Sequence, residues 1–262
     1  MNTLRELPFV TVGNEAVANA PVDSWFVELR RARIDAPYVR TTGQGESCAL
    51  LLTGTFDLRG AATHWQSRGA RTNEREGRPV AVFLPPRTEF AATNGSGSIL
   101  FVEARQPTAA PATGRAALQQ SPLLPLSGSG KSFDPTRGEW LPAESFPSAA
   151  ESLPPRRIQQ VHCGPVRVER VFAADYKAMS LLVDEAVVPG ATTLDLAALP
   201  LTPHVREALI YVRSDHEVAL HLGDLRATGR GECVFHATGA IADLRIEAAQ
   251  GPCYVVLACA PK

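Results

Sequence analysis

The chain has 262 residues, enough for one large domain or two domains of ordinary size. Its residues are 45% hydrophobic and 20% charged, with a formal net charge of −1, so it can bury a sizeable core but has no basic field to gather nucleic acid. No apolar run approaches the roughly 20 residues of a membrane span, and the first residues lack a signal-peptide pattern. We therefore expect a cytoplasmic protein with no nucleic-acid or membrane partner.

Short apolar runs separated by turn residues predict an all-β fold, because long helical periodicity is scarce and the chain contains 20 Gly and 21 Pro. Gly54 is expected to join two short strands, and Asn94-Gly95 is a strong hairpin signal. The expected strands of the first half are 24–33, 47–52, 55–58, 80–84, 89–92 and 99–103. Those of the second half are 156–162, 166–172, 179–188, 208–212, 216–220, 232–236, 242–248 and 253–258.

The stretch from Gly77 to Phe90 carries the clearest local signal. The run Val80 to Leu84 is β-branched and apolar, and it stops at Pro85-Pro86, which fix the backbone and donate no hydrogen bond. This pattern predicts a buried strand that ends in a rigid turn.

Between the halves the composition changes to Pro, Gly, Ser and Ala, with few large apolar residues. The segment exceeds an ordinary loop, so we expect it to separate two modules. The predicted organisation is an N-terminal barrel (1–106), a linker or crossing segment (107–155) and a C-terminal barrel (156–262). The two halves also match in the order of their strands, each ending in an apolar strand followed by Pro.

The first half carries Leu51-Leu-Thr-Gly54 at an expected turn, followed by Gly77 and Pro85-Pro86. The second half carries Glu207 before a turn at Ser214, with Gly231-Glu232 opening a second motif. In these features both halves resemble the cupin pattern, with Glu207 at its usual spacing before the turn and Glu89 where the pattern has a third His. The resemblance implies two cupin (jelly-roll) barrels in tandem, a bicupin.

A narrower resemblance rests on five segments: Trp65 to Arg71, Val82-Phe-Leu-Pro-Pro-Arg-Thr-Glu-Phe90, Arg157-Ile-Gln-Gln-Val-His162, Ser180-Leu-Leu-Val-Asp-Glu185 and Glu207-Ala-Leu-Ile-Tyr211. In these segments the chain resembles the bicupin family of 5-deoxy-glucuronate isomerase of inositol catabolism and its relative, the keto-uronate isomerase. Where that family has a Pro-Pro-His-x-His-Asp run, this chain reads Asp195 to His204 and keeps at most one His.

The resemblance implies an intramolecular oxidoreductase that interconverts aldose and ketose forms of a sugar acid. Such a reaction moves a proton between neighbouring carbons and can use a metal to polarise the carbonyl. Candidate catalytic residues are Glu207 and His162, and Tyr211 and Arg206 are candidates for substrate binding. One divalent ion (Zn, Mn or Fe) would have the incomplete ligand set His204, Glu207, His221 and His236, or be absent.

Two functions therefore stay open. One is a divergent sugar-acid isomerase, and the other is a non-catalytic bicupin that binds a small metabolite or serves as a regulatory or assembly protein. We also expect a homodimer or higher homo-oligomer, because the edge strands of two barrels need covering.

Overall fold

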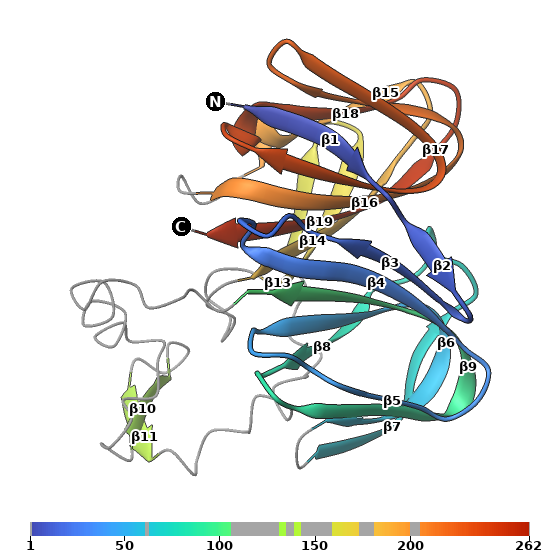
Figure 1. The fold of residues 1–262 in the computed structure, drawn as a ribbon, viewed down its shortest axis with the longest axis vertical. Helices are drawn as coiled ribbons and strands as arrows, with labels where there is room; N and C mark the ends of the chain where they lie inside the picture. Colours follow the sequence, from blue (N-terminus) through green and yellow to red (C-terminus); the bar gives the residue numbers. More distant parts are fainter. Residues whose placement is uncertain are drawn as a thin grey trace.

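The structure is a computed structural model that describes residues 2–60, 63–105, 131–134, 139–142, 159–172, 181–199 and 205–261. The described chain is built from strands, with two short 3₁₀ turns at η2 (Leu196–Ala198) and η3 (Ile241–Asp243). The expectation of an all-β protein is thus confirmed. Two large antiparallel sheets are stacked, with most first-half strands in the lower part of Figure 1, and the second-half strands together with β1 in the upper part.

The first sheet has eight strands and contains only residues of the first half. Its main order is β2 (Val10–Val12), β3 (Glu15–Asn19), β4 (Phe26–Ile34), β9 (Glu89–Ala104), β6 (Ser47–Gly60) and β7 (Thr63–Arg71). Two further strands fold over to close the barrel: β5 (Tyr38–Thr41) pairs with β9, and β8 (Val80–Leu84) pairs with β6.

The second sheet has nine strands and includes the N-terminal strand of the chain. Its main order is β1 (Thr3–Leu7), β17 (Leu225–Thr238), β16 (Val205–Leu222), β19 (Cys253–Pro261), β14 (Leu182–Val188), β13 (Val166–Phe172) and β12 (Gln159–Cys163). The strand β18 (Leu244–Ala248) pairs with β16 and with β15 (Thr192–Asp195).

The sheet pairing differs from the expected domain boundaries at the start of the chain. Residues 3–7 pair with 234–238 of the second barrel, so the N-terminal barrel does not begin at residue 1. Most of the expected linker, 107–155, lies outside the described residues. Within it, β10 (Lys131–Asp134) and β11 (Glu139–Pro142) form a separate antiparallel pair, which the composition did not predict.

Glycines mark bulges in long strands rather than the turns that we expected. The predicted breaks at Gly54 and at Asn94-Gly95 fall inside β6 and β9, which stay paired throughout. Gly54 and Gly97 have positive φ angles of 91° and 151°, and each lies directly against the opposite backbone. A side chain there would collide with that backbone, so glycine lets two paired strands bend together around the barrel. The expected break between 212 and 216 is likewise a bulge within β16.

The predicted strand 80–84 is confirmed as β8, and the turn after it is clamped to the segment before β6. The hydroxyl of Thr42 donates to the carbonyl of Pro85 at 2.8 Å and accepts from the backbone N–H of Thr88 at 2.8 Å. Arg87 lies between them with a positive φ of 57°, and its N–H donates to the carbonyl of Gly43 at 2.9 Å. Because Pro85 and Pro86 cannot extend the ladder, side-chain and turn hydrogen bonds hold this corner.

Three apolar clusters show which face of each strand is inside. One cluster contains first-half residues such as Phe101 and fills the first barrel, and another, built around Ile210 and Phe235, fills the second. The third contains residues of both halves, including Leu50 and Leu209, and lies between the two large sheets. Side chains alternate along a strand, so each main strand sends one set of residues into its barrel and the other set toward the partner barrel.

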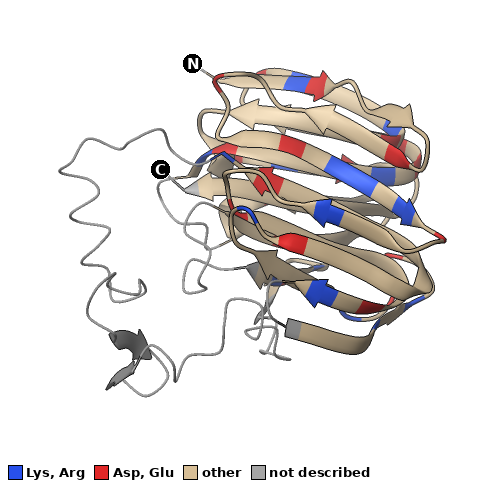
Figure 2. Cartoon of the chain, turned by 60° about the horizontal axis from the view of Figure 1, so that its bottom comes forward, with Lys and Arg blue, Asp and Glu red and all other residues tan. Residues whose placement is uncertain are grey.

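Charged residues of both signs are interspersed along the strands, and the face drawn in Figure 2 has no extended patch of one sign. Among the described residues, no helix is long and apolar enough to cross a membrane.

Candidate functional site

The side-chain parity of β16 places Glu207 between the barrels. Ala208 and Ile210 belong to the cluster that fills the second barrel, whereas Leu209 belongs to the cluster between the sheets. Glu207 shares its face with Leu209, so its carboxylate does not point into the second barrel, where the cupin resemblance would place a ligand. The spacing along the sequence correctly predicted that Glu207 lies on a strand, but it did not predict which face of the sheet its side chain occupies.

The Glu207 carboxylate is a buried contact between the two halves of the chain. His236 on β17 lies 2.8 Å from Glu207 Oε1 through its Nε2 atom, the hydroxyl of Ser24 donates to the same oxygen, and the backbone N–H of Trp25 donates to Oε2 at 3.1 Å. Burial alone would raise the pKa of Glu207, but the hydrogen bonds from His236, Ser24 and Trp25 lower it overall. This arrangement favours an ionised carboxylate at neutral pH, which joins the barrels.

Replacing Glu207 with Gln should lower the free energy of unfolding by about 2 kcal/mol at neutral pH, because hydrogen bonds to a charged acceptor are lost. A lowered pKa in the folded state contributes stability that is present above the ordinary value of 4.5 and is lost as the pH falls through the folded value. The difference between wild type and variant should therefore shrink in acid. Urea unfolding across a pH series measures it.

The matched control is His236→Asn, which leaves the Glu207 carboxylate in place. The double variant with both substitutions separates the contributions of the two side chains. A difference between wild type and Glu207→Gln that stayed constant down to strongly acidic pH would contradict this assignment.

The other predicted site residues are spread over the second barrel. His221 is half-buried, lies 3.4 Å from Glu247 of β18, and has neighbours Leu220 and Leu222 that point into the barrel, so it faces outward. His162 is exposed on the edge strand β12, and Arg206 is exposed on β16. His204 lies outside the described residues. Of the predicted set, the structure thus brings together only Glu207 and His236.

Tyr211 is fully buried between the sheets rather than exposed to a substrate. Its hydroxyl donates to Glu232 at 2.6 Å, and its ring packs edge-on against Tyr254 with centroids 6.3 Å apart. Burial, reinforced by the neighbouring carboxylate of Glu232, raises the pKa of Tyr211 well above its ordinary value. The residue therefore serves the packing of the two barrels.

The described residues do not fit the metal site that the resemblance implies. The Glu207 oxygens are taken by three donors, and His236 uses Nε2 for the same carboxylate while Nδ1 is buried without a partner. Within the described ranges, no three His, Cys, Asp or Glu side chains gather closely enough to bind an ion. We therefore derive no chemical step through a metal.

A different polar site lies at the mouth of the first barrel, in a cavity of about 440 Å³. Glu103 follows Phe101 by two residues on β9 and so faces the barrel interior, and Glu28 is its direct neighbour on β4. Arg40 donates from one nitrogen to Glu28 at 2.7 Å and to Glu103 at 3.1 Å. Arg30 binds Glu28 through two nitrogens, at 2.9 Å and 3.0 Å.

The remaining contacts extend this site into an alternating chain of charges. Glu15 accepts from Arg30 and, at 2.7 Å, from the hydroxyl of Tyr38. The guanidinium carbon of Arg40 lies 5.3 Å from the centre of the Phe101 ring, over its face. Three carboxylates and two guanidiniums alternate along this chain of contacts, in the order Glu15, Arg30, Glu28, Arg40 and Glu103.

The two inner carboxylates have pKa shifts of opposite direction. Burial raises the pKa of Glu103, and the neighbouring Glu28 adds to this, against the opposing effect of Arg40. Burial would also raise the pKa of Glu28, but hydrogen bonds from Arg30 and Arg40 lower it overall. Neighbouring carboxyl groups whose pKa values diverge are the usual basis of acid and base roles.

Sequence reasoning did not find Glu28, Arg40 or Glu103. A usable signal was present, since Ile99, Phe101 and Glu103 occupy alternate positions of one predicted strand. A charged residue at the inward position of an apolar strand must have a buried partner. The partner, Arg40, belongs to the short strand β5, which the sequence did not predict.

No model of a protein family matches the sequence, and no curated protein is significantly similar to it. Solved structures do match. An IolB-like protein from Salmonella typhimurium has 13% identity and a TM-score of 0.59, over 90% of this chain and 84% of that one.

An oxalate decarboxylase variant from Bacillus subtilis has 10% identity and a TM-score of 0.59, over 98% of this chain and 76% of that one. A formate complex of the Lactobacillus farciminis oxalate decarboxylase has 12% identity and a TM-score of 0.56, over 98% and 85%. At such identities the likeness concerns the fold alone, and with the two stacked sheets it shows that this chain is a tandem cupin jelly roll.

Proposed function

We propose that this chain binds a sugar acid in the mouth of the first barrel and interconverts its aldose and ketose forms. The observation that carries the proposal is the buried carboxyl of Glu103, whose pKa is raised beside the partly unused guanidinium of Arg40. The likeness in fold to an IolB-like protein supports this class of substrate. The proposal moves the site from Glu207 and the second barrel to the first barrel.

Arg40 is the group that would bind the carboxylate of the sugar acid. Its contacts with Glu28 and Glu103 use a single terminal nitrogen, and its Nε is buried without a partner among the described residues. A planar guanidinium with free donors binds a carboxylate through two hydrogen bonds. The hydroxyl of Ser47, also buried without a partner, is directly opposite Glu103 and could serve a substrate hydroxyl.

Glu103 would move the proton. In its ionised form it takes the proton from C2, next to the carbonyl at C1, which gives an enediolate. Transfer of the O2–H proton to O1 moves the carbonyl to C2, and Glu103 returns its proton to C1. A raised pKa makes this carboxylate a stronger base than an ordinary Glu. When Arg40 binds the substrate carboxylate, its contact with Glu103 weakens, and this raises the pKa of Glu103 further.

The test is hydrogen exchange in D₂O, followed by proton NMR with 5-deoxy-glucuronate, glucuronate and galacturonate. The proposal predicts loss of the signal at C2 and appearance of the ketose for at least one of these acids. Neutral glucose, which lacks the carboxylate, is the matched control and should exchange far more slowly.

Saturable binding without exchange would overturn the isomerase proposal and favour a non-catalytic bicupin that binds a sugar acid. If none of the three acids shows binding or exchange, both the isomerase proposal and the sugar-acid-binding alternative are overturned.

A further inference from the structure

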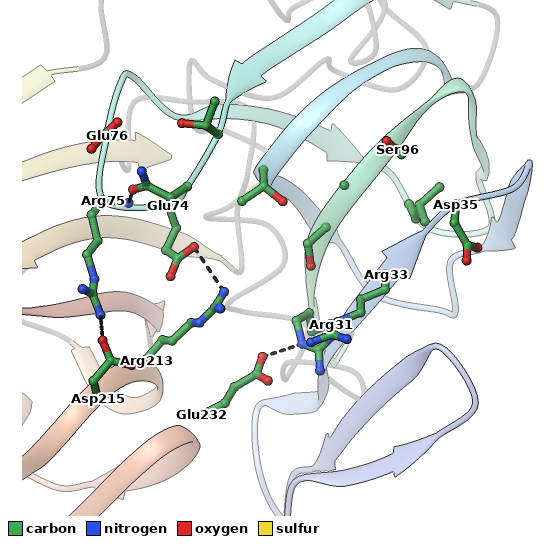
Figure 3. Close-up of a pocket in the computed structure, with 16 residues that line it drawn as sticks. Arg31, Arg33, Asp35, Glu74, Arg75, Glu76, Ser96, Arg213, Asp215 and Glu232 are labelled. Carbon is green, nitrogen blue, oxygen red and sulfur yellow. Dashed lines mark hydrogen bonds and ion pairs between the residues drawn. The ribbon is translucent and has the colours of Figure 1, made fainter.

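We propose that a second ligand site lies between the two barrels and takes a small metabolite with a carboxylate or phosphate group. The cavity there has a volume of about 740 Å³ and is distinct from the mouth of the first barrel. Residues of β4, β6, β9, β16, β17 and the segment after β7 line it. Figure 3 shows this cavity with its lining side chains.

Three ion pairs cross between the barrels at this cavity. Arg31 of the first barrel pairs with Glu232 of the second through its Nε. In the opposite direction, Arg213 of the second barrel lies 3.2 Å from Glu74 of the first. The third pair joins Arg75 to Asp215 at 3.3 Å. Because the barrels meet here through charges rather than apolar packing, the space between them accepts a polar ligand.

The arginines of these pairs retain unused hydrogen-bond donors. In the described structure, each of the three uses one nitrogen for its carboxylate: Nε in Arg31, Nη1 in Arg213 and Nη2 in Arg75. A guanidinium has five N–H donors in a fixed plane. The carboxylate of Glu232 has a second donor besides Arg31, because it also accepts a hydrogen bond from the hydroxyl of Tyr211. The lining contains four arginines and five carboxylates, so an oxyanion would be bound by the N–H donors that the ion pairs leave unused rather than by a net positive charge.

Arg33 adds positive charge on one side of the cavity. It follows Arg31 by two residues on β4, so the two side chains share a face, and Figure 3 shows them next to each other. Arg33 has no ion pair with any described residue, whereas Arg31 is paired with Glu232. Thr53, Ser96 and Ser98 also line the cavity, and the hydroxyl of Ser98 donates to the carbonyl of Ala32 at 3.3 Å. The hydroxyl-bearing side chains of Thr53 and Ser96 suit the hydroxyl groups of a metabolite.

Titration calorimetry on the full chain tests the site, with citrate and inorganic phosphate as separate probes. Substituting Arg33→Gln should weaken saturable binding by about tenfold or more, because a charge-assisted hydrogen bond is lost. Substituting Glu76→Gln, which removes an exposed lining carboxylate, should strengthen it. The matched control is Arg59→Gln, which removes the same charge from an exposed ion pair with Glu89 outside the cavity.

Saturation by citrate alone assigns the site to carboxylates, and saturation by phosphate alone assigns it to phosphorylated metabolites. The absence of saturable binding by both probes would overturn the site. Equal weakening in Arg33→Gln and Arg59→Gln would overturn it too, since it would indicate unspecific attraction by net charge. None of these substitutions touches Glu103 or Arg40, so the outcome is independent of the proposed isomerisation.

Discussion

Replacing Arg71 with Met should lower the free energy of unfolding by about 3–5 kcal/mol, because it leaves a buried carboxylate without its counter-ion. Arg71 ends β7 of the first barrel, and its Nη1 donates to Glu185 of the second barrel at 2.9 Å, with a second contact from Nη2. Tyr254 donates to the same carboxylate at 2.9 Å. The side chains of Arg71 and Glu185 are 6% and 3% exposed, so water cannot replace the lost partner.

Urea unfolding followed by tryptophan fluorescence measures this loss, with Arg59→Met as the matched control. Arg59 and Glu89 form an ion pair whose side chains are 58% and 54% exposed, and breaking such a pair costs about 1 kcal/mol or less. A similar loss of unfolding free energy in Arg71→Met and Arg59→Met would show that burial of the ion pair does not determine the size of the loss.

A triple variant separates two contributions to the free energy of unfolding: the penalty for a buried unpaired charge and the net stabilisation by the ion pair. Arg71→Met, Glu185→Leu and Tyr254→Phe together remove the ion pair and the hydroxyl and leave apolar side chains of similar size. The carbonyls of Glu76 and Gly77, which also accept from Arg71, stay in place. We expect most of the stability to return, because well-packed apolar residues commonly replace a buried ion pair without loss. A triple variant as unstable as Arg71→Met would contradict this account.

Replacing Glu103 with Gln should lower the rate of hydrogen exchange at C2 of the bound sugar acid by about 10²–10⁴-fold, the usual contribution of a general base. Gln keeps the size of the side chain and can still accept a hydrogen bond from Arg40, so binding of the sugar acid should change little. Exchange rates measured by NMR and affinities measured by calorimetry distinguish these two effects.

The pH profile gives a second measurement of Glu103. In wild type, the exchange rate should rise with pH as Glu103 ionises, over a range displaced upward from the ordinary value of 4.5. Glu103→Asp should restore part of the rate, and Glu89→Gln, an exposed carboxylate of the same barrel, should leave it unchanged. Exchange that persists in Glu103→Gln would remove Glu103 from the mechanism.

Most strand positions follow from local pattern. The predicted strands 80–84 and 166–172 coincide with β8 and β13. Residues within and next to such segments determine where the strand begins and ends, because Gly or Pro bounds it. The breaks predicted at Gly54 and Asn94-Gly95 are wrong, because a glycine that permits a turn also permits a bulge. Whether such a glycine forms a turn or a bulge depends on the partner strand, which is far away in the sequence.

The position of the site was harder to predict than the fold. Spacing along β16 selected Glu207, but one position of register separates a side chain inside the barrel from one between the barrels. The network at the mouth of the first barrel depends on Arg40, from a four-residue strand with little apolar character. Its contact with Glu103 joins residues 63 positions apart, which no local pattern could indicate.

The pairing of β1 with β17 has a consequence for the synthesis of the chain. Thr3 is opposite Thr238, so β1 leaves the ribosome long before its partner strand β17 has been made. The edge of β1 therefore stays unpaired until β17 has been synthesised, and the second sheet is completed only afterwards. Such distant contacts slow folding, and they make completion of one barrel depend on the strand that leads into the other.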